Sequence, residues 1–182
     1  MKDFTDKELV QLFQDSSNKN YAFDLIVRKY QEKLYWHIRK IVISHDDADD
    51  VLQNALINAY FGLEQFRKDA SLYTWLYRIA TNEALSALKK KKRRLILNLE
   101  NVRSYLEQTL EEDPYCSGDE IQIKLQKAIL TLPDKQRLVF NMKYFDEMKY
   151  EDIAEVLGTS VGALKASYHH AVKKIEKYLE SD

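Results

Sequence analysis

The chain has 182 residues, of which 45% are hydrophobic and 31% charged, and this predicts one globular domain or two small ones. Four glycines, two prolines and one cysteine favour long helices over a many-stranded barrel, and exclude a disulfide framework and a cysteine-based zinc site. The polar start and the lack of an apolar run of about 20 residues predict a soluble, cytoplasmic, all-α protein with no signal peptide and no membrane insertion.

Charge is distributed unevenly along the chain, although the formal net charge is only −1. Residues 1–94 hold 17 Lys or Arg and 13 Asp or Glu, residues 95–119 hold 1 and 6, and residues 120–182 hold 10 and 10. Pro114 and Gly118 mark the acidic middle as a linker, of which 95–110 has a partly helical pattern. We therefore predict two small helical domains, 1–94 and 120–182, joined by an acidic linker at 95–119.

Apolar residues at three- and four-residue spacing predict four helices in residues 1–94. Thr5 and Glu8 fit a capping box, Asn20 is the expected cap of a longer second helix, and Ser44 precedes the third. The fourth helix is expected to begin at Leu72 and to end in the basic run at 89–94. In the second domain, a helix ending near Thr131 is followed by a new start at 132–133.

The acidic cluster at 46–50 admits three interpretations. Carboxylates favour a helix N-terminus, and the letters also fit the Asp-Asp-x-x-Asp magnesium motif of isoprenoid synthases, but no second acidic motif accompanies them. The third interpretation is a docking surface for another helix, which belongs either to this domain or to a second protein. One side of the predicted helix combines acidic, amide and apolar residues: Asp46, Asp50, Gln53, Asn54, Ile57 and Phe61. No glycine-rich phosphate loop or nucleophile motif is present, so we expect no catalytic residue, metal or cofactor.

Residues 66–82 interleave aromatic, basic and amide side chains, and the basic run at 89–94 follows directly. Aromatic faces stack on bases at about 1–3 kcal/mol each, and cations follow the phosphate backbone, so this pattern is typical of single-stranded nucleic acid binding. The alternative is that Trp75, Leu76 and Ile79, which have helical spacing, are ordinary core residues.

Residues 150–176 have the spacing of a helix-turn-helix. Gly158 stands where a tight turn favours a positive φ, Ser160 can cap the next helix, and Leu164 is placed to pack back on the first helix. A helical wheel puts the apolar residues Val161, Leu164, Tyr168, Val172 and Ile175 on one side. The other side is small near its start and basic near its end, as suits a helix in the major groove: Ala163, Ala166, Ser167, His170, Lys173 and Lys174. An ordinary helical hairpin with a solvated basic face is the alternative; the adjacent histidines at 169–170 point apart and do not suit a metal.

Four strings in this order resemble the extracytoplasmic-function (ECF) group of bacterial RNA polymerase sigma factors: DDADDVLQ at 46–53, SLYTWLYRIATN at 71–82, LPDKQRLVF at 132–140 and YEDIAEVLGTSVG at 150–162. The resemblance extends over nearly the whole stretch from Tyr21 to Leu179. It implies sigma regions 2 and 4, no catalysis by the chain, and no small-molecule substrate. It also implies that the chain binds the β′ and β subunits of core RNA polymerase and supplies promoter recognition, and an anti-sigma factor is the usual partner in the family.

The resemblance assigns three sets of contact residues. Core polymerase, through the β′ coiled coil, is expected at Asp46, Asp47, Asp49, Asp50, Gln53, Asn54 and Ile57. The unwound non-template strand of the minus-10 element, with one base flipped into the loop at 66–71, is expected at Phe66, Arg67, Lys68, Asp69, Ala70, Ser71, Tyr73, Trp75, Arg78 and Asn82. The minus-35 element is expected to be read as duplex by Ser160, Gly162, Ala163, Lys165, Ala166, Ser167, His170, Lys173 and Lys174.

The sequence departs from the family pattern at four positions. Asn54 stands where an acidic residue is common, Ser86 where Asp is frequent, and Ser167 and His170 where Arg is usual or frequent. Bidentate Arg is the commonest reader of guanine, so a different base preference is expected. The near-neutral charge suits a subunit that polymerase tethers to DNA, and the acidic linker is expected to mimic nucleic acid in the polymerase cleft. A helix-turn-helix regulator that acts without joining polymerase is the alternative function.

Overall fold

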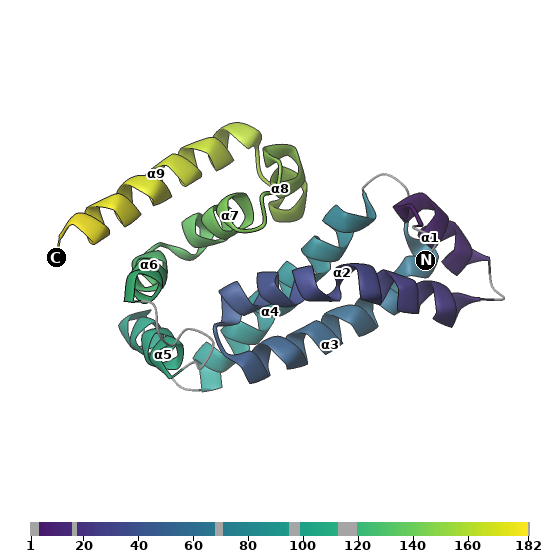
Figure 1. Cartoon of the computed structure of the whole chain (residues 1–182), viewed down its shortest axis with the longest axis horizontal. Helices are drawn as coiled ribbons and strands as arrows, with labels where there is room; N and C mark the ends of the chain where they lie inside the picture. Colours follow the sequence, from purple (N-terminus) through teal and green to yellow (C-terminus); the bar gives the residue numbers. More distant parts are fainter. Residues whose placement is uncertain (1–3, 16–17, 68–70, 95–98, 113–119, 182) are drawn as a thin grey trace.

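The computed structural model describes residues 4–15, 18–67, 71–94, 99–112 and 120–181, and within these ranges the regular structure is entirely helical (Figure 1). This confirms the predicted all-α class. The elements are α1 (Asp6–Gln14), α2 (Lys19–Val42), α3 (His45–Gly62), the short 3₁₀ helix η1 (Leu63–Gln65), α4 (Leu72–Arg94), α5 (Leu99–Glu111), α6 (Glu120–Leu130), α7 (Asp134–Tyr144), α8 (Tyr150–Leu157) and α9 (Val161–Glu180). In the described residues no helix is long and apolar enough to cross a membrane.

The first helical unit is formed by α1 to α4, in which α2 packs against α1, α3 and α4. The apolar stripes predicted from the sequence meet in its core, where several large side chains are almost completely buried: Leu9, Phe13, Ile26, Leu34, Ile38, Leu63 and Leu76. Burying each such side chain contributes about 1.5–3 kcal/mol, so this core is a large favourable contribution to folding of the unit.

Two of the three predicted caps in this unit are confirmed. The Thr5 N–H donates to Glu8 Oε2 at 2.8 Å in a capping box, and the Ser44 hydroxyl accepts from the Asp47 N–H at 3.3 Å. The expected cap at Asn20 is wrong, because α2 begins two residues earlier and its N-cap residue is Asn18. The Asn20 side chain instead accepts a hydrogen bond from the Tyr60 hydroxyl of α3 at 2.9 Å, so it joins two helices.

The second helical unit consists of α6 to α9, and α9 packs against the other three helices. Phe140 is buried between two rings that stack on it, Tyr144 at 5.2 Å and Tyr168 at 5.8 Å between centroids. Around this stack a small core forms from Ala128, Ile129, Leu132, Ala171 and Ile175. Pro133 is the N-cap residue of α7, with φ of −55°, and lies within the predicted start at 132–133.

Helix α5 lies inside the segment that the sequence predicts as a linker, where a partly helical pattern was expected. Its Leu106 and Leu110 are buried and share a small cluster with three residues of other helices. These are Ile43, the C-cap residue of α2, Leu88 near the end of α4, and Leu130, the last residue of α6. The linker residues Pro114, Cys116 and Gly118 lie outside the described residues. Helix α5 thus packs on both helical units.

The two units also touch directly. Helix α8 packs along α4, and α7 contacts α2 (Figure 1). One continuous apolar cluster joins the first unit's Leu72 and Leu76 to residues of the second unit, including Met148, Ile153 and Leu164. Helix α9 lies beyond α7 and α8, at the edge of the molecule, so its outer side faces away from α2 to α4 (Figure 1).

Candidate nucleic-acid interface

The turn between α8 and α9 has the geometry predicted for a helix-turn-helix. Gly158 adopts the left-handed conformation, with φ of 61° and ψ of 42°, and ends α8. The Ser160 hydroxyl accepts from the Ala163 N–H at 3.3 Å and so caps α9. Leu164 is fully buried against the core. All three predictions for this turn are confirmed, and together they fix the direction in which α9 leaves α8.

The outer side of α9 carries most of the predicted duplex-binding residues in exposed positions: Ser160, Gly162, Ala163, Lys165, Ala166, His170, Lys173 and Lys174. Ser167 is half-buried, and Lys174 Nζ donates to Gln136 Oε1 of α7 at 3.1 Å. Ala171, which the helical wheel left unassigned, is fully buried. The result is a flat, small-residue start followed by lysines, and this lets the backbone approach base edges while cations meet phosphates.

The segment around α4 separates into core and surface residues. Phe66 is buried, and its ring lies 5.0 Å from that of Trp75, which is half-buried. A Cβ at Gly62 would approach Trp75 Cζ2 to 2.9 Å, so a glycine is needed where the indole crosses the end of α3. Among the predicted strand-binding residues the exposed ones are Arg67, Ser71, Arg78 and Asn82, with Tyr73 half-buried. Lys68, Asp69 and Ala70 lie outside the described residues.

Ser71 has a structural role that the sequence analysis missed. Its hydroxyl accepts from the Thr74 N–H at 3.0 Å, and its carbonyl accepts from the Trp75 N–H at 3.0 Å, so it caps α4. Serine directly before an apolar helical stretch is a known cap signal, and it could have been found in the sequence. The cap fixes where the aromatic part of α4 begins.

The acidic helix α3 has a continuous exposed stripe and a second set of residues with partners inside the chain. The stripe consists of Asp50, Gln53, Asn54, Ile57 and Phe61, of which Ile57 is 54% and Phe61 72% exposed. Asp46 is exposed in the first turn, whereas Asp47 is half-buried and forms an ion pair with Lys91 of α4. Asp49 is half-buried and lies 3.5 Å from His45 Nε2.

No group of three or more His, Cys, Asp or Glu side chains that could hold a metal occurs in the part of the chain that the structure describes. His169 and His170 are exposed neighbours on α9 whose ring centroids are 6.0 Å apart. Two of the acidic residues at the start of α3 have partners inside the chain: Asp47 pairs with Lys91, and Asp49 lies next to His45.

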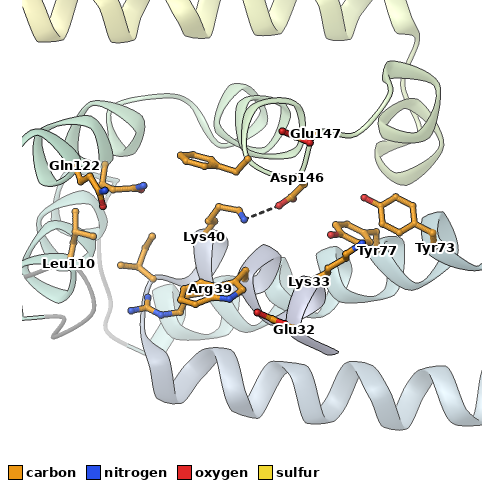
Figure 2. A pocket seen from close by; sticks show the side chains of 14 residues that line it. Glu32, Lys33, Arg39, Lys40, Tyr73, Tyr77, Leu110, Gln122, Asp146 and Glu147 are labelled. Atoms are coloured by element: carbon orange, nitrogen blue, oxygen red, sulfur yellow. Dashed lines mark ion pairs between the residues drawn. The ribbon is translucent and has the colours of Figure 1, made fainter. Parts of the chain in front are cut away.

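The structure also has a pocket with charged lining residues between the two units, which the sequence did not predict. A pocket of about 820 Å³ lies between α2, α4, the α7–α8 turn and α5 and α6, and its lining includes Trp36, Lys40, Tyr73, Tyr77 and Asp146 (Figure 2). Asp146 pairs with His37 and Lys40 of α2 across the interface. No periodic pattern in the sequence marks these residues, because the pairing joins positions 109 residues apart.

The fold and this surface define a two-part helical protein with a DNA-binding type of helix-turn-helix. Family models match both parts: Sigma-70 region 2 at residues 26–94 and Sigma-70, region 4 at residues 122–175. The chain is 34% identical to RNA polymerase sigma-H factor of Pseudomonas aeruginosa (96% of this chain, 94% of that protein) and 34% identical to ECF RNA polymerase sigma factor SigW of Bacillus subtilis (87% and 89%). The sigma factor RpoE of Bartonella quintana, solved with the anti-sigma factor NepR, has a similar fold: TM-score 0.68, 22% identity, 88% of this chain and 98% of that one.

The chain therefore belongs to the ECF group of RNA polymerase sigma factors, in the sigma-70 family. This confirms the resemblance on which the contact sets were assigned. Sigma factors are initiation factors without enzymatic activity, which bind core polymerase and direct it to promoters. The comparisons do not support the alternative of a regulator that acts without polymerase.

Proposed function

We propose that the exposed stripe of α3 docks on core RNA polymerase, at the coiled coil of the β′ subunit. The observation that carries this assignment is the exposure of Ile57 and Phe61 beside the carboxylate of Asp50. Large apolar side chains that are exposed together and rimmed by polar groups mark a protein interaction site. Asp47 contributes less to docking than Asp50, because Lys91 already neutralises it inside the chain.

The two DNA contacts follow from the same assignment. The start of α4, with Trp75, Arg78 and Asn82, binds the unwound non-template strand of the minus-10 element, and the outer side of α9 binds the minus-35 element as duplex. Regions 2 and 4 correspond to residues 1–94 and 120–182, and α5 belongs to the linker between them. The small residues at the start of α9 and the absence of Arg at 167 and 170 give a base preference based on close backbone approach.

Two further assignments complete the proposal. The protein acts in the cytoplasm, where bacterial polymerase and promoter DNA are found. An anti-sigma factor holds it inactive, as the sigma factor of Bartonella quintana with a similar fold was solved with one. The pocket of about 820 Å³ between the two units offers aromatic, basic and acidic groups to such a partner.

Docking is tested by the double substitution Asp50→Lys with Gln53→Ala. The expected result is at least tenfold weaker binding to core polymerase, because a cation replaces the carboxylate next to the apolar stripe. The matched control is Asp24→Lys with Gln31→Ala, which makes the same changes at exposed positions of α2. Binding is measured by anisotropy of the labelled full chain, and circular dichroism checks that both variants are folded. Equal affinities for the two variants and the unmodified chain would contradict the docking assignment.

A further inference from the structure

The contact between the two units is built around a buried carboxylate. The side chain of Asp146, in the turn between α7 and α8, is only 4% exposed. Its Oδ2 lies 2.7 Å from His37 Nδ1. Its Oδ1 lies 2.8 Å from Lys40 Nζ, the ion pair drawn in Figure 2. Burial acts to raise the pKa of Asp146, but the hydrogen bond and charge of His37 and the charge of Lys40 outweigh it, so this pKa lies below its ordinary value. The carboxylate is ionised and receives two charge-assisted bonds from the first unit.

Both ring nitrogens of His37 have partners inside the chain. Nε2 lies 2.8 Å from the Thr81 hydroxyl, which donates to the Tyr77 carbonyl at 2.7 Å. Nδ1 faces the Asp146 carboxylate, which only accepts. His37 and Lys40 thus form a socket on α2 for one carboxylate of the second unit. An isolated buried charge is costly, so the socket and Asp146 each need the other.

Acidic groups of the second unit face the first unit elsewhere along the contact. Asp134 of α7 lies 3.4 Å from Lys92 Nζ, and Asp152 of α8 accepts from the Thr74 hydroxyl at 3.5 Å. Glu155 of α8 lines a pocket of about 340 Å³ whose other lining residues include Arg67, Trp75 and Arg78 of the candidate strand-binding surface. Carboxylates thus occupy the side of α4 that is proposed to receive the phosphates of a DNA strand.

The contact is also a packed apolar interface. Met148, Ile153 and Val156 of the second unit belong to the same buried cluster as Leu72 and Leu76 of α4. Tyr73 and Tyr77, whose rings are 4.5 Å apart, lie beside Asp146 and Glu147 on the wall of the larger pocket (Figure 2). In contrast, the outer side of α9 is exposed. The closed arrangement therefore covers part of one proposed DNA surface, where Tyr73 and Trp75 are half-buried and Glu155 lies beside Arg67 and Arg78, and it leaves the other surface open.

We propose that this contact is autoinhibitory: Asp146, held in the socket of His37 and Lys40, keeps α8 over α4 and so denies α4 to single-stranded DNA until a partner separates the two units. This inference rests on the proposed role of α4. The carboxylates of α8 occupy the place at α4 that the phosphates of the DNA strand would take. The free chain holds its units closed, and polymerase, by binding each unit separately, replaces the contact.

The test compares Asp146→Ala with the matched control Asp24→Ala, which removes an exposed carboxylate paired with Arg28 at 2.8 Å on α2. Small-angle scattering measures the radius of gyration of the free full chain without DNA. Anisotropy measures its affinity for a labelled non-template oligonucleotide, taken from a promoter mapped by transcription with wild-type holoenzyme. Lys40→Ala is a second opening variant that leaves His37 paired with Asp146. Circular dichroism checks that each variant is folded.

Asp146→Ala is expected to expand the free chain and to bind the strand at least tenfold more tightly than wild type. Lys40→Ala should give smaller changes in the same directions, and the control should match wild type. If neither opening variant expands, the socket does not hold the units together and the inference is overturned. If they expand without a gain in strand affinity while wild-type holoenzyme binds the strand, the contact is not inhibitory. Failure of wild-type holoenzyme to bind the strand would instead refute the role of α4, and the inhibition with it, whereas scattering would still report closure.

Discussion

Gly158→Ala is expected to destabilise the helix-turn-helix by about 1 kcal/mol. The φ of 61° lies in the left-handed region, which costs a non-glycine residue about 1–2 kcal/mol. A Cβ at this position would meet no atom within 4 Å, so steric overlap adds nothing to that cost. Alanine also reduces the entropy of the unfolded chain, which offsets about 0.4–1 kcal/mol of the penalty. The net magnitude follows from backbone conformation alone.

Gly162→Ala is the internal control, because the same methyl group is added four residues later with the opposite expected sign. A Cβ at Gly162 also meets nothing within 4 Å, but this residue lies in the first turn of α9 with no positive φ. Alanine there gains helix propensity and should stabilise the unit by about 0.5–1 kcal/mol. The methyl group would also stand on the proposed base-reading side, so minus-35 duplex binding should weaken although stability rises.

Urea unfolding of the full chain, followed by circular dichroism, measures both changes in the free energy of unfolding. Gly158→Asn should cost less than Gly158→Ala, because asparagine tolerates the left-handed conformation better. Destabilisation of similar size at positions 158 and 162 would refute the conformational argument, since only one of the two glycines has a positive φ.

Two further predictions concern charge. Replacing both Lys173 and Lys174 with alanine should weaken minus-35 duplex binding and reduce the slope of log affinity against log salt by about 2. The base preference should stay unchanged, because phosphate contacts carry little sequence information. A changed preference in a binding-site selection would place these lysines at base edges. Because the pKa of Asp146 is lowered in the folded chain, its contribution to the closed form is present above the ordinary value of 3.8 and is lost as the pH falls through the lower folded-state value. Scattering should record this acid expansion in wild type but not in Asp146→Ala, and equal acid expansion in both would contradict the prediction.

Local chemistry made much of the fold predictable. Capping residues and apolar spacing act within one or two helical turns, so the sequence alone identifies Thr5, Ser44 and Ser160 as caps and Gly158 as the turn residue. The cap predicted at Asn20 is wrong because an asparagine near the start of a helix can either cap that helix or bind a distant partner. Asn20 binds the hydroxyl of Tyr60.

The sequence predicted less well which candidate site residues are exposed and free of ion pairs, because composition does not reveal which side chains contact one another in the fold. Phe66 has the chemistry of a stacking residue, but it is buried against Trp75. Asp47 and Asp50 read alike in the sequence, yet Lys91, 44 positions away, pairs with Asp47 alone. A helical wheel separates the sides of one helix, whereas the neighbouring helix decides which exposed charges are already neutralised.

The sequence by itself determined the helical class, the two-part organisation and the helix-turn-helix, since spacing, caps and turn residues are local properties of the chain. The tertiary structure decided how the parts meet. Ile43 has a φ of 67°, which a β-branched residue rarely adopts, and its side chain is buried in the cluster with Leu88, Leu106 and Leu130. Asp146 became the centre of the interface because His37 and Lys40 of α2 were brought to it from more than 100 residues away in the chain. Such pairings depend on the path of the whole backbone, and no local pattern encodes that path.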